Sequence, residues 1–376
     1  MLINEIGSRD LQTQKKAIKK SVDLEDSQEI LDRVESTLQS GELAQRLGAV
    51  LKQDADTKKL YRLVSQVIVN VPSALDDKLK FIENFPKGFV KISTLMSPGV
   101  VTDFSKSIPD PFAYRVFMAL KDVVIQGVGP GEFALAALSP RIKSMGQRSG
   151  GGDLLINGVN VEVKGARRGE GGQISGGRWT DPRKANFNLA PIRDLLTQYY
   201  NFSPDAKSLT GAGWVALRDG STVSKQNQKK LVAAIVRGNF AKYQGPALAD
   251  VEQALMTGDE PAIRRAWARA CYENYKSYSG FAGMLILDFS KNSSLYFSDY
   301  DDGEQYVKIE SVQLWGPEQS TAPQVSLTGP AKAAAKTGKQ DAASEKQPEK
   351  TKAAPAPIRA RFEPANPTDS GARKQR

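Results

Sequence analysis

GGGDLLINGVNVEVKG, residues 150–165, is the stretch of sequence that decides the fold. Two short apolar segments, DLLI and VNVEVKG, flank Asn157-Gly158, the dipeptide that most strongly favours a tight turn between antiparallel strands. The stretch therefore predicts a β-hairpin. Its glycines at 150–152 and 165 would let a bulky polyanion approach the backbone closely.

One face of this predicted hairpin carries three charged side chains. Because alternate residues of a strand share a face, Glu162 and Lys164 lie together, while Val161 and Val163 point toward the core. Counting back from the turn places Asp153 near the level of Glu162, about 5 Å away at Cβ. Two carboxylates this close repel, and a divalent cation between them cancels the charge. The alternative is a solvated hairpin face with an incidental Glu–Lys pair.

The composition limits the chemistry that such a face can perform. The chain contains no histidine and a single cysteine, Cys271. Catalysis by Ser-His-Asp or Cys-His groups within the chain is thereby excluded, as is a structural zinc site. Carboxylates without histidine favour Mg2+ or Mn2+. We expect Cys271 to be a buried helical thiol, in a chain that occupies a reducing compartment such as the cytoplasm.

A metal between two carboxylates suits phosphodiester hydrolysis, because the cation polarises the phosphate and lowers the pKa of water without histidine. A neighbouring lysine can orient that water or stabilise developing charge. The net charge of +10 is compatible with a polyanionic partner. No pattern of the phosphate-cradling Gly-x4-Gly-Lys-Ser/Thr type is present.

Gly-Asp, eight residues, then Glu-Val-Lys resembles the PD-(D/E)xK nuclease superfamily, whose members include restriction enzymes, Holliday-junction resolvases and phage nucleases. The resemblance covers roughly residues 128–185, with glycine in place of the proline. It implies that Asp153 and Glu162 are metal ligands and that Lys164 is the catalytic lysine. It also implies that Glu132, at the start of a helix before the hairpin, is a further ligand or orienting acid. The usual third and fourth strands do not follow soon after the second.

The resemblance implies a metal-dependent DNA nuclease that uses Mg2+ or Mn2+. Basic residues in the surrounding loops are candidates for contacts with the DNA phosphates, and ordinary loop solvation is their alternative. These residues are Arg148, Arg167, Arg168, Arg178 and Lys184; Gln173 and Ser175 are candidates to line the site. A second class of function is a nuclease-like fold used without catalysis for DNA binding or in a phage particle or DNA-packaging assembly, which would place the protein in a host cytoplasm or a virion.

The chain divides into three predicted parts. Residues 1–125, where apolar residues recur at helical spacing, predict a helical N-terminal domain that can contact other virion or DNA-processing proteins. Residues 126–316 predict an α/β (α+β) nuclease domain with a restriction-endonuclease-like core: a mixed central sheet flanked by helices. Residues 317–376, with eleven Lys and Arg against six Asp and Glu, predict a disordered basic tail.

Further elements are predicted inside the second part. Helices are expected at 188–200, 224–242 and 260–278, and residues 214–219 fit a strand or a helix. In the third helix Ile263, Trp267, Cys271 and Tyr275 form a core stripe. GMLILDFS is expected to be a buried strand, with SLYFSDY and YVKIESVQLW completing its sheet. No segment approaches the length of apolar chain that a membrane span requires. The oligomeric state is left open.

Overall fold

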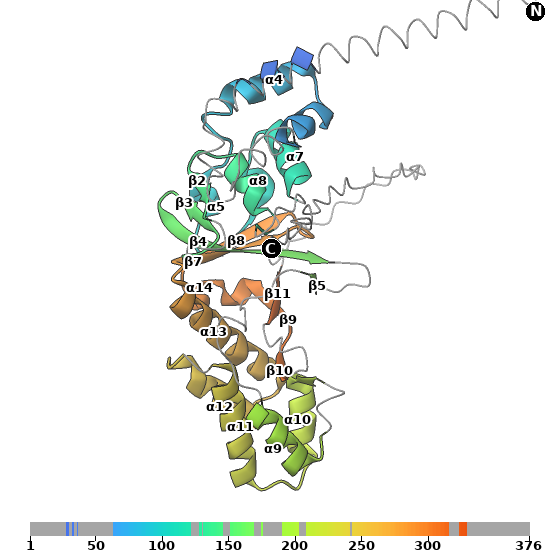
Figure 1. Cartoon of the computed structure of the whole chain (residues 1–376), viewed down its shortest axis with the longest axis vertical. Helices are drawn as coiled ribbons and strands as arrows, with labels where there is room; N and C mark the ends of the chain where they lie inside the picture. The colour runs from blue at the N-terminus through green and yellow to red at the C-terminus, as the bar shows by residue number, and fades with distance from the viewer. Residues whose placement is uncertain are drawn as a thin grey trace, which may run out of the picture.

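The computed structural model describes residues 28–29, 32–33, 36, 63–121, 128–129, 131–145, 151–168, 174–175, 190–202, 208–240, 243–315 and 323–328. These residues form an elongated molecule with a sheet across its middle and helices at both ends (Figure 1). The mixture of helices and a central mixed sheet agrees with the predicted α+β class.

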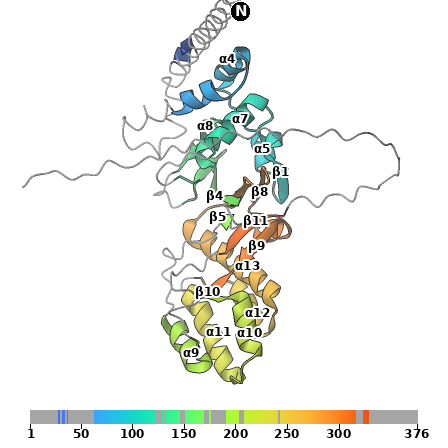
Figure 2. The same ribbon diagram turned by 90° about the vertical axis from the view of Figure 1, so that its right-hand side faces the viewer.

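The first half of the chain supplies one helical end and four of the six strands of the central sheet (Figure 2). Residues 63–70 are helical as well. The remaining elements are α4 (Leu75–Asn84), α5 (Ile92–Leu95), β1 (Val100–Asp103), α6 (Phe104–Ser107), α7 (Pro111–Leu120), α8 (Glu132–Ala137), β2 (Ile142–Ser144), β3 (Leu154–Ile156), β4 (Val159–Arg168) and β5 (Ile174–Ser175).

The second half supplies the other helical end and returns to the sheet. Its elements are α9 (Ala190–Tyr200), β6 (Leu209–Thr210), α10 (Gly211–Asp219), α11 (Lys225–Asn239), α12 (Ala247–Thr257), α13 (Glu260–Ser279), β7 (Gly283–Asp288), β8 (Ser293–Phe297), α14 (Tyr300–Gly303), the 3-10 helix η2 (Glu304–Tyr306), β9 (Val307–Ser311), β10 (Gln313–Trp315) and β11 (Gln324–Leu327).

Six strands form the central sheet in the order β1-β8-β7-β4-β3-β2, and β5 pairs with the end of β4. All neighbours are antiparallel except β4 and β7, which run parallel from Val161 opposite Gly283 to Ala166 opposite Asp288. A parallel pair needs a crossover connection. Here that connection contains the whole helical end from α9 to α13, so the strand that continues the hairpin lies far along the chain.

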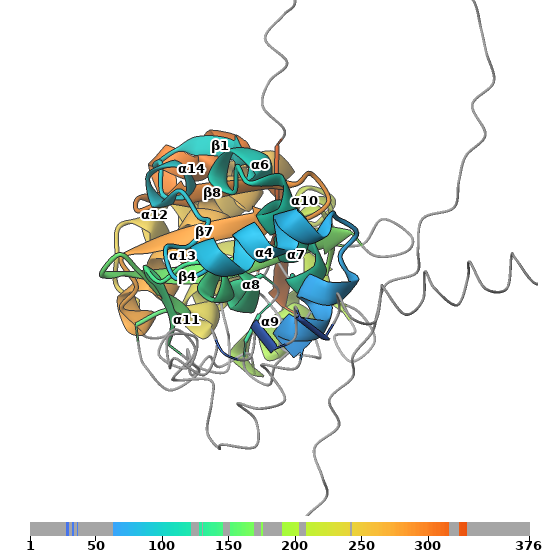
Figure 3. The ribbon, with the colours of Figure 1, turned by 90° about the horizontal axis from the view of Figure 1, so that it is seen from above.

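The sheet separates two apolar cores, and β7 contributes to both. Leu285 and Leu287 pack into a core shared with α4 to α8. Met284 and Ile286 point to the opposite face, into a core shared with α9 to α13. All six residues of β7 are buried, because each face of this strand is covered. The segment GMLILD is therefore the buried strand that the sequence predicts. The view from above shows α4, α7 and α8 lying over the sheet (Figure 3).

The predicted boundary at residue 125 does not separate two cores. β1 lies before that boundary, yet it pairs with β8 in the central sheet. The apolar cluster of the N-terminal helices continues without interruption through Val161 and Leu285. The helices after residue 62 thus cover one face of the sheet. Ile30, Val34 and Leu38, apolar residues that recur at helical spacing in the first part of the sequence, lie outside the described residues.

The start of the predicted disordered tail at residue 317 is wrong, because β11 lies inside that segment. This strand pairs antiparallel with β9, and its Val325 and Leu327 are fully buried. The buried Asp288 carboxylate accepts a hydrogen bond from the backbone N–H of Leu327 at 3.1 Å. Burial of the two apolar side chains and pairing with β9 are thus enough to order a strand of four residues in a polar part of the sequence. The rest of the predicted tail, from residue 329 on, lies outside the described residues.

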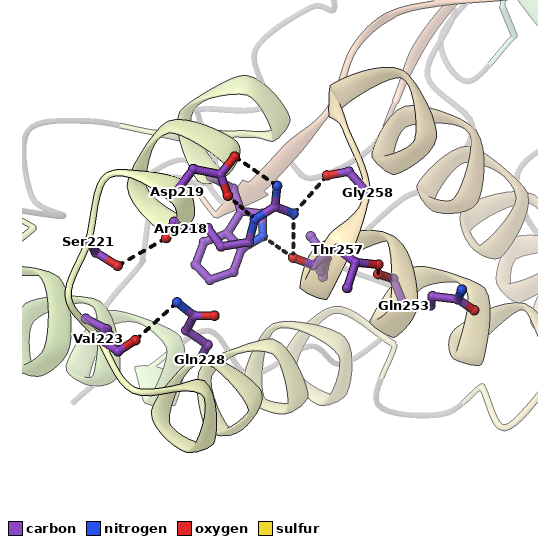
Figure 4. Close-up of polar contacts among 10 residues, drawn as sticks. Arg218, Asp219, Ser221, Val223, Gln228, Gln253, Thr257 and Gly258 are labelled. Atoms are coloured by element: carbon purple, nitrogen blue, oxygen red, sulfur yellow. Dashed lines mark hydrogen bonds and ion pairs between the residues drawn. The ribbon is translucent and has the colours of Figure 1, made fainter.

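The predicted helices of the second half form at α9, α11 and α13, and the ambiguous residues 214–219 belong to α10. Helix α12 was not predicted. Arg218, whose side chain is largely buried, donates hydrogen bonds to the carbonyl oxygens of Leu255 at 3.3 Å and Gly258 at 2.8 Å at the end of this helix (Figure 4). These bonds satisfy carbonyl groups that a helix end leaves without partners.

The expectation for SLYFSDY is met by β8, next to β7 in the sheet. The expectation that YVKIESVQLW completes the same sheet is wrong: β9 pairs with β11 and β10 pairs with β6, in two separate two-stranded sheets. Cys271 is buried in α13 as predicted, and burial raises the pKa of its thiol well above its ordinary value. Of the helices in the described ranges, none is long and apolar enough to span a membrane.

Candidate active site

The hairpin forms with the register that its turn predicts. Asn157 and Gly158 have positive φ angles of 50° and 86°, as a two-residue turn of this kind requires. Leu154 then pairs with Val161, and Asp153 lies next along its strand. The backbone N–H of Val163 donates to Asp153 Oδ2 at 2.9 Å. The predicted proximity of Asp153 to this part of β4 is therefore confirmed.

Gly152 makes this approach possible. Its φ is +101°, and a Cβ atom at this position would lie 2.8 Å from the carbonyl carbon and oxygen of Val161. Its neighbour Asp153 donates its backbone N–H to the same carbonyl oxygen at 2.9 Å. Glycine is the residue that accepts both constraints without strain. Gly152 thus has a specific structural role in bringing Asp153 to β4.

The two faces of β4 divide as predicted. Val161 and Val163 are buried in the core of the N-terminal helices. On the other face, Lys164 Nζ lies 2.5 Å from Glu162 Oε1, and the Glu162 side chain is almost completely buried. Both side chains contact Tyr275 of α13, whose hydroxyl donates to Glu162 Oε1 and accepts from Lys164 Nζ at 3.3 Å. The pair is therefore an internal, partnered cluster and not a solvated hairpin face.

Asp153 and Glu162 lie within each other's electrostatic influence, and the backbone N–H of Val163, the residue after Glu162, donates to Asp153 Oδ2 at 2.9 Å. Burial raises the pKa of Asp153 to about 7, and Glu162 adds to the rise, against the lowering effects of Lys164 and the Val163 N–H. Near neutral pH Asp153 is thus only partly ionised, and a cation bound beside it would favour its charged form.

Glu132 belongs to the same electrostatic cluster. It begins α8, is 5% exposed, and accepts a hydrogen bond from the backbone of Gly129. Burial raises its pKa well above the ordinary value; the negative charge of Asp153 raises it further, whereas Gly129 and Lys164 lower it. An acid that served only to stabilise the positive end of the helix dipole would be expected in solvent, with an ordinary pKa. Glu132 is instead buried with the other acids.

Lys164 remains a cation. Burial alone would lower the pKa of its ammonium group, but Glu162, Tyr275 and Asp153 together outweigh burial and raise it above the ordinary value. The pKa of the Tyr275 hydroxyl is also raised, first by burial and also by Glu162. At neutral pH both groups are therefore hydrogen-bond donors, and neither can serve as a general base.

The oxygen atoms of these side chains are the type of ligand that a hard divalent cation prefers. The carboxyl groups of Asp153 and Glu162 offer oxygen ligands, and the negative charge of Glu162 adds to the raised pKa of Asp153. Within the ranges that the structure describes, no group of three or more His, Cys, Asp or Glu side chains is arranged to hold a metal ion. Asp153 and Glu162 are accordingly the pair that would bind the cation, with Glu132 nearby in the same electrostatic field.

Tyr275 is the site residue that sequence reasoning missed. It was assigned to a core stripe with Ile263, Trp267 and Cys271, and all four are indeed buried. Spacing cannot tell a tyrosine that only packs from one whose hydroxyl serves a site. The available signal was chemical: a tyrosine on a buried stripe needs a hydrogen-bond partner for its hydroxyl.

The predicted phosphate contacts are described only in small part. The backbones of Arg167 and Arg168 form the end of β4, where they pair with Ser175 and Ile174 of β5. The side chains of these arginines, and the residues Arg148, Gln173, Arg178 and Lys184, lie outside the described part of the chain. Contacts of the loop residues with DNA therefore stay a prediction.

No model of a protein family matches the chain, and comparisons with curated proteins and with solved structures likewise gave no match.

Proposed function

We propose that the protein is a metal-dependent DNA nuclease that hydrolyses phosphodiester bonds. The observation that carries this proposal is the convergence of Asp153, Glu162 and Lys164 on one face of the β3–β4 hairpin. Two coupled acids and a permanently charged lysine, buried together without histidine, are a costly arrangement for a structural role. They are the groups that phosphate hydrolysis assisted by a hard cation requires.

Each residue has a defined part in the proposed reaction. Asp153 and Glu162 would hold Mg2+ or Mn2+, which supplies charge neutralisation at the phosphate and lowers the pKa of water. Lys164 stays protonated and donates hydrogen bonds to the attacking water or to the phosphate oxygens. Tyr275 fixes the positions of Glu162 and Lys164 through its hydroxyl. Glu132 would orient the acids or extend the ligand set.

The order of elements supports the same proposal. A helix that begins with Glu132 precedes the strand pair that carries Asp153 and Glu162, as the resemblance to the PD-(D/E)xK superfamily implies. The strand β7, displaced in sequence by the helical end, lies directly beside β4 in the sheet. Residues 283–288 would then be the continuation of the sheet that this resemblance implies. We accordingly propose a restriction-endonuclease-like core with a large helical insertion.

Cleavage of supercoiled plasmid with Mg2+ or Mn2+ tests the proposal. Lys164→Ala and Asp153→Asn should each lower the cleavage rate about 100-fold or more, the range seen when a donor to developing charge is removed. Lys143→Ala is the matched control, because Lys143 is an exposed lysine on β2 of the same sheet. Cleavage that survives both site substitutions would refute the assignment.

A second candidate is a nuclease-like fold that binds DNA, or serves in a virion or packaging assembly, without cleaving. Two observations favour it: the absence of a three-residue metal group among the described side chains, and the engagement of Glu162 Oε1 by both Lys164 and Tyr275. Salt-dependent DNA binding with no cleavage of any DNA form, in either cation, would favour this candidate over the enzyme.

A further inference from the structure

A hollow of about 600 Å³ lies at the far end of the hairpin, away from the acid cluster. Three segments form it: the connection from α4 through α5, the connection between α8 and β2, and the hairpin turn. In Figure 1 α5, β2 and β3 lie together at this place. The lining residues are Lys87, Val90, Lys91, Ile92, Ser93, Met96, Ser139, Arg141 and Asn157.

The charge of the hollow is of one sign. Lys87, Lys91 and Arg141 are exposed side chains, and no acidic residue is among the lining residues. Among the described residues no carboxylate forms an ion pair with any of these three cations. Like charges gathered around one concavity repel each other, and a bound anion removes that repulsion.

The walls of the hollow are fixed to one another by backbone hydrogen bonds. Phe89 N–H donates to the carbonyl oxygen of Leu138 at 2.8 Å, and Asn157 N–H donates to that of Arg141 at 2.8 Å. Gly88, with φ of +78°, lies so close to this wall that a Cβ atom would be 2.5 Å from Pro140 Cδ. The three segments therefore present their cations from a preformed surface, which lowers the entropic cost of binding an anion.

We infer that this hollow binds the phosphate backbone of double-stranded DNA. Several separate cations around one concavity match successive phosphates, and serine and asparagine side chains add hydrogen-bond donors. No aromatic residue lines the hollow, so it offers no surface on which unpaired bases or a free nucleotide base would stack. This lining therefore suits a phosphate backbone that is recognised by its charge and whose bases are already paired.

The position of the hollow suits a duplex that also reaches the acid cluster. Asn157 lies four residue steps after Asp153, roughly 13 Å along a strand at about 3.3 Å per residue. A DNA strand rises about 3.4 Å per nucleotide, so this span is roughly four nucleotides. A duplex lying along the hairpin would thus place phosphates in the hollow a few nucleotides from the acids. Binding in the hollow does not itself depend on cleavage.

The test is the salt dependence of DNA binding, measured by fluorescence anisotropy on a short duplex in EDTA, where no metal-dependent cleavage can occur. The variant combines Lys87→Gln, Lys91→Gln and Arg141→Gln. The control combines Lys225→Gln, Lys229→Gln and Lys230→Gln, three exposed lysines of α11 at the opposite helical end. Each triple variant loses three positive charges, so a general effect of net charge on DNA binding should be the same for both variants.

The inference predicts that the hollow variant alone binds at least about tenfold more weakly at low salt. It also predicts that the slope of log K against log salt decreases by about 2 to 3, since each lost phosphate contact removes about 0.9. Each single substitution should lower the slope by about one. Equal affinities and slopes for the two triple variants would overturn the inference. It would also be overturned if a single strand of equal length, or tripolyphosphate alone, showed the larger dependence on these three residues. Absence of cleavage by the wild-type chain would count against the proposed function and leave this measurement intact.

Discussion

Asp153→Asn should stabilise the metal-free protein at alkaline pH. The folded state raises the pKa of Asp153 from 3.8 to about 7, so the folded chain holds a proton that the unfolded chain releases. Below about pH 4 the carboxyl is protonated in both states and costs nothing. Between pH 4 and 7 the stability of the wild-type protein falls as pH rises, and above pH 7 the cost is constant.

The size of this cost follows from the shift. About three pKa units at ~1.4 kcal/mol each give an upper bound of about 4 kcal/mol. Asp153 as a whole residue is only half-buried, so solvent relieves part of the cost, and we expect about half of the bound, ~2 kcal/mol. Asparagine can still accept the hydrogen bond from the Val163 N–H, and it carries no charge to bury. The gain should raise Tm by roughly 4–8 °C at pH 8.

The assay is thermal unfolding in EDTA from pH 4 to 8, followed by circular dichroism. Asp250→Asn, an exposed acid on α12, serves as the control and should change Tm little at any pH. The difference between Asp153→Asn and the wild-type chain should vanish near pH 4 and grow toward pH 7. An Asn variant that is no more stable at pH 8, or a difference that does not depend on pH, would refute the reasoning.

Three further substitutions test other parts of the structure. Tyr275→Phe removes the hydroxyl that links Glu162 and Lys164 but keeps the ring, so cleavage should slow about tenfold. The control Tyr199→Phe should leave the cleavage rate unchanged. Equal cleavage rates for the two variants would contradict a positioning role of Tyr275. Arg218→Met leaves the Gly258 carbonyl without its partner, whereas the Leu255 carbonyl keeps the hydrogen bond from Trp214 Nε1. The variant should therefore cost about 1–2 kcal/mol, read as a lower midpoint in urea, with cleavage intact below the transition. Gly152→Ala should destabilise by about 2 kcal/mol or more, because its Cβ meets the Val161 carbonyl. Gly158→Ala, where the added atom meets open space, should cost only about 1 kcal/mol for its positive φ; if the two glycine variants are equally stable, the close approach at Gly152 does not matter.

The hairpin and its acids could be predicted because their signals are local. Asn157-Gly158 sets the turn, the turn sets the register, and the alternation of a strand sets which side chains share a face. The parallel pairing of β4 with β7 could not be predicted in this way. This pairing joins segments that are more than a hundred residues apart. The alternation of apolar and polar residues along a strand does not indicate which other strand it pairs with.

The failure to predict Tyr275 as a site residue and the wrong start of the predicted disordered tail have related causes. The role of Tyr275 arises from the crossover that brings α13 over β4, so helical spacing alone assigned it to the core. Composition led us to include residues 324–327 in a disordered tail, because two apolar side chains are few in a long polar segment. Their burial depends on the edge that β9 provides. Both errors arise from tertiary contacts, which the local pattern of residues in the sequence does not reveal.

Titration calorimetry with Mn2+ on the wild-type chain and on Asp153→Asn and Glu162→Gln tests the central claim most directly. At pH 6 the wild-type chain should bind Mn2+ with a defined stoichiometry and release protons on binding, because Asp153, whose pKa is raised to about 7, is largely protonated in the metal-free chain. Both variants should lose that binding. A wild-type chain that binds no Mn2+, or variants that bind it as well as the wild-type chain does, would contradict a metal site at Asp153 and Glu162.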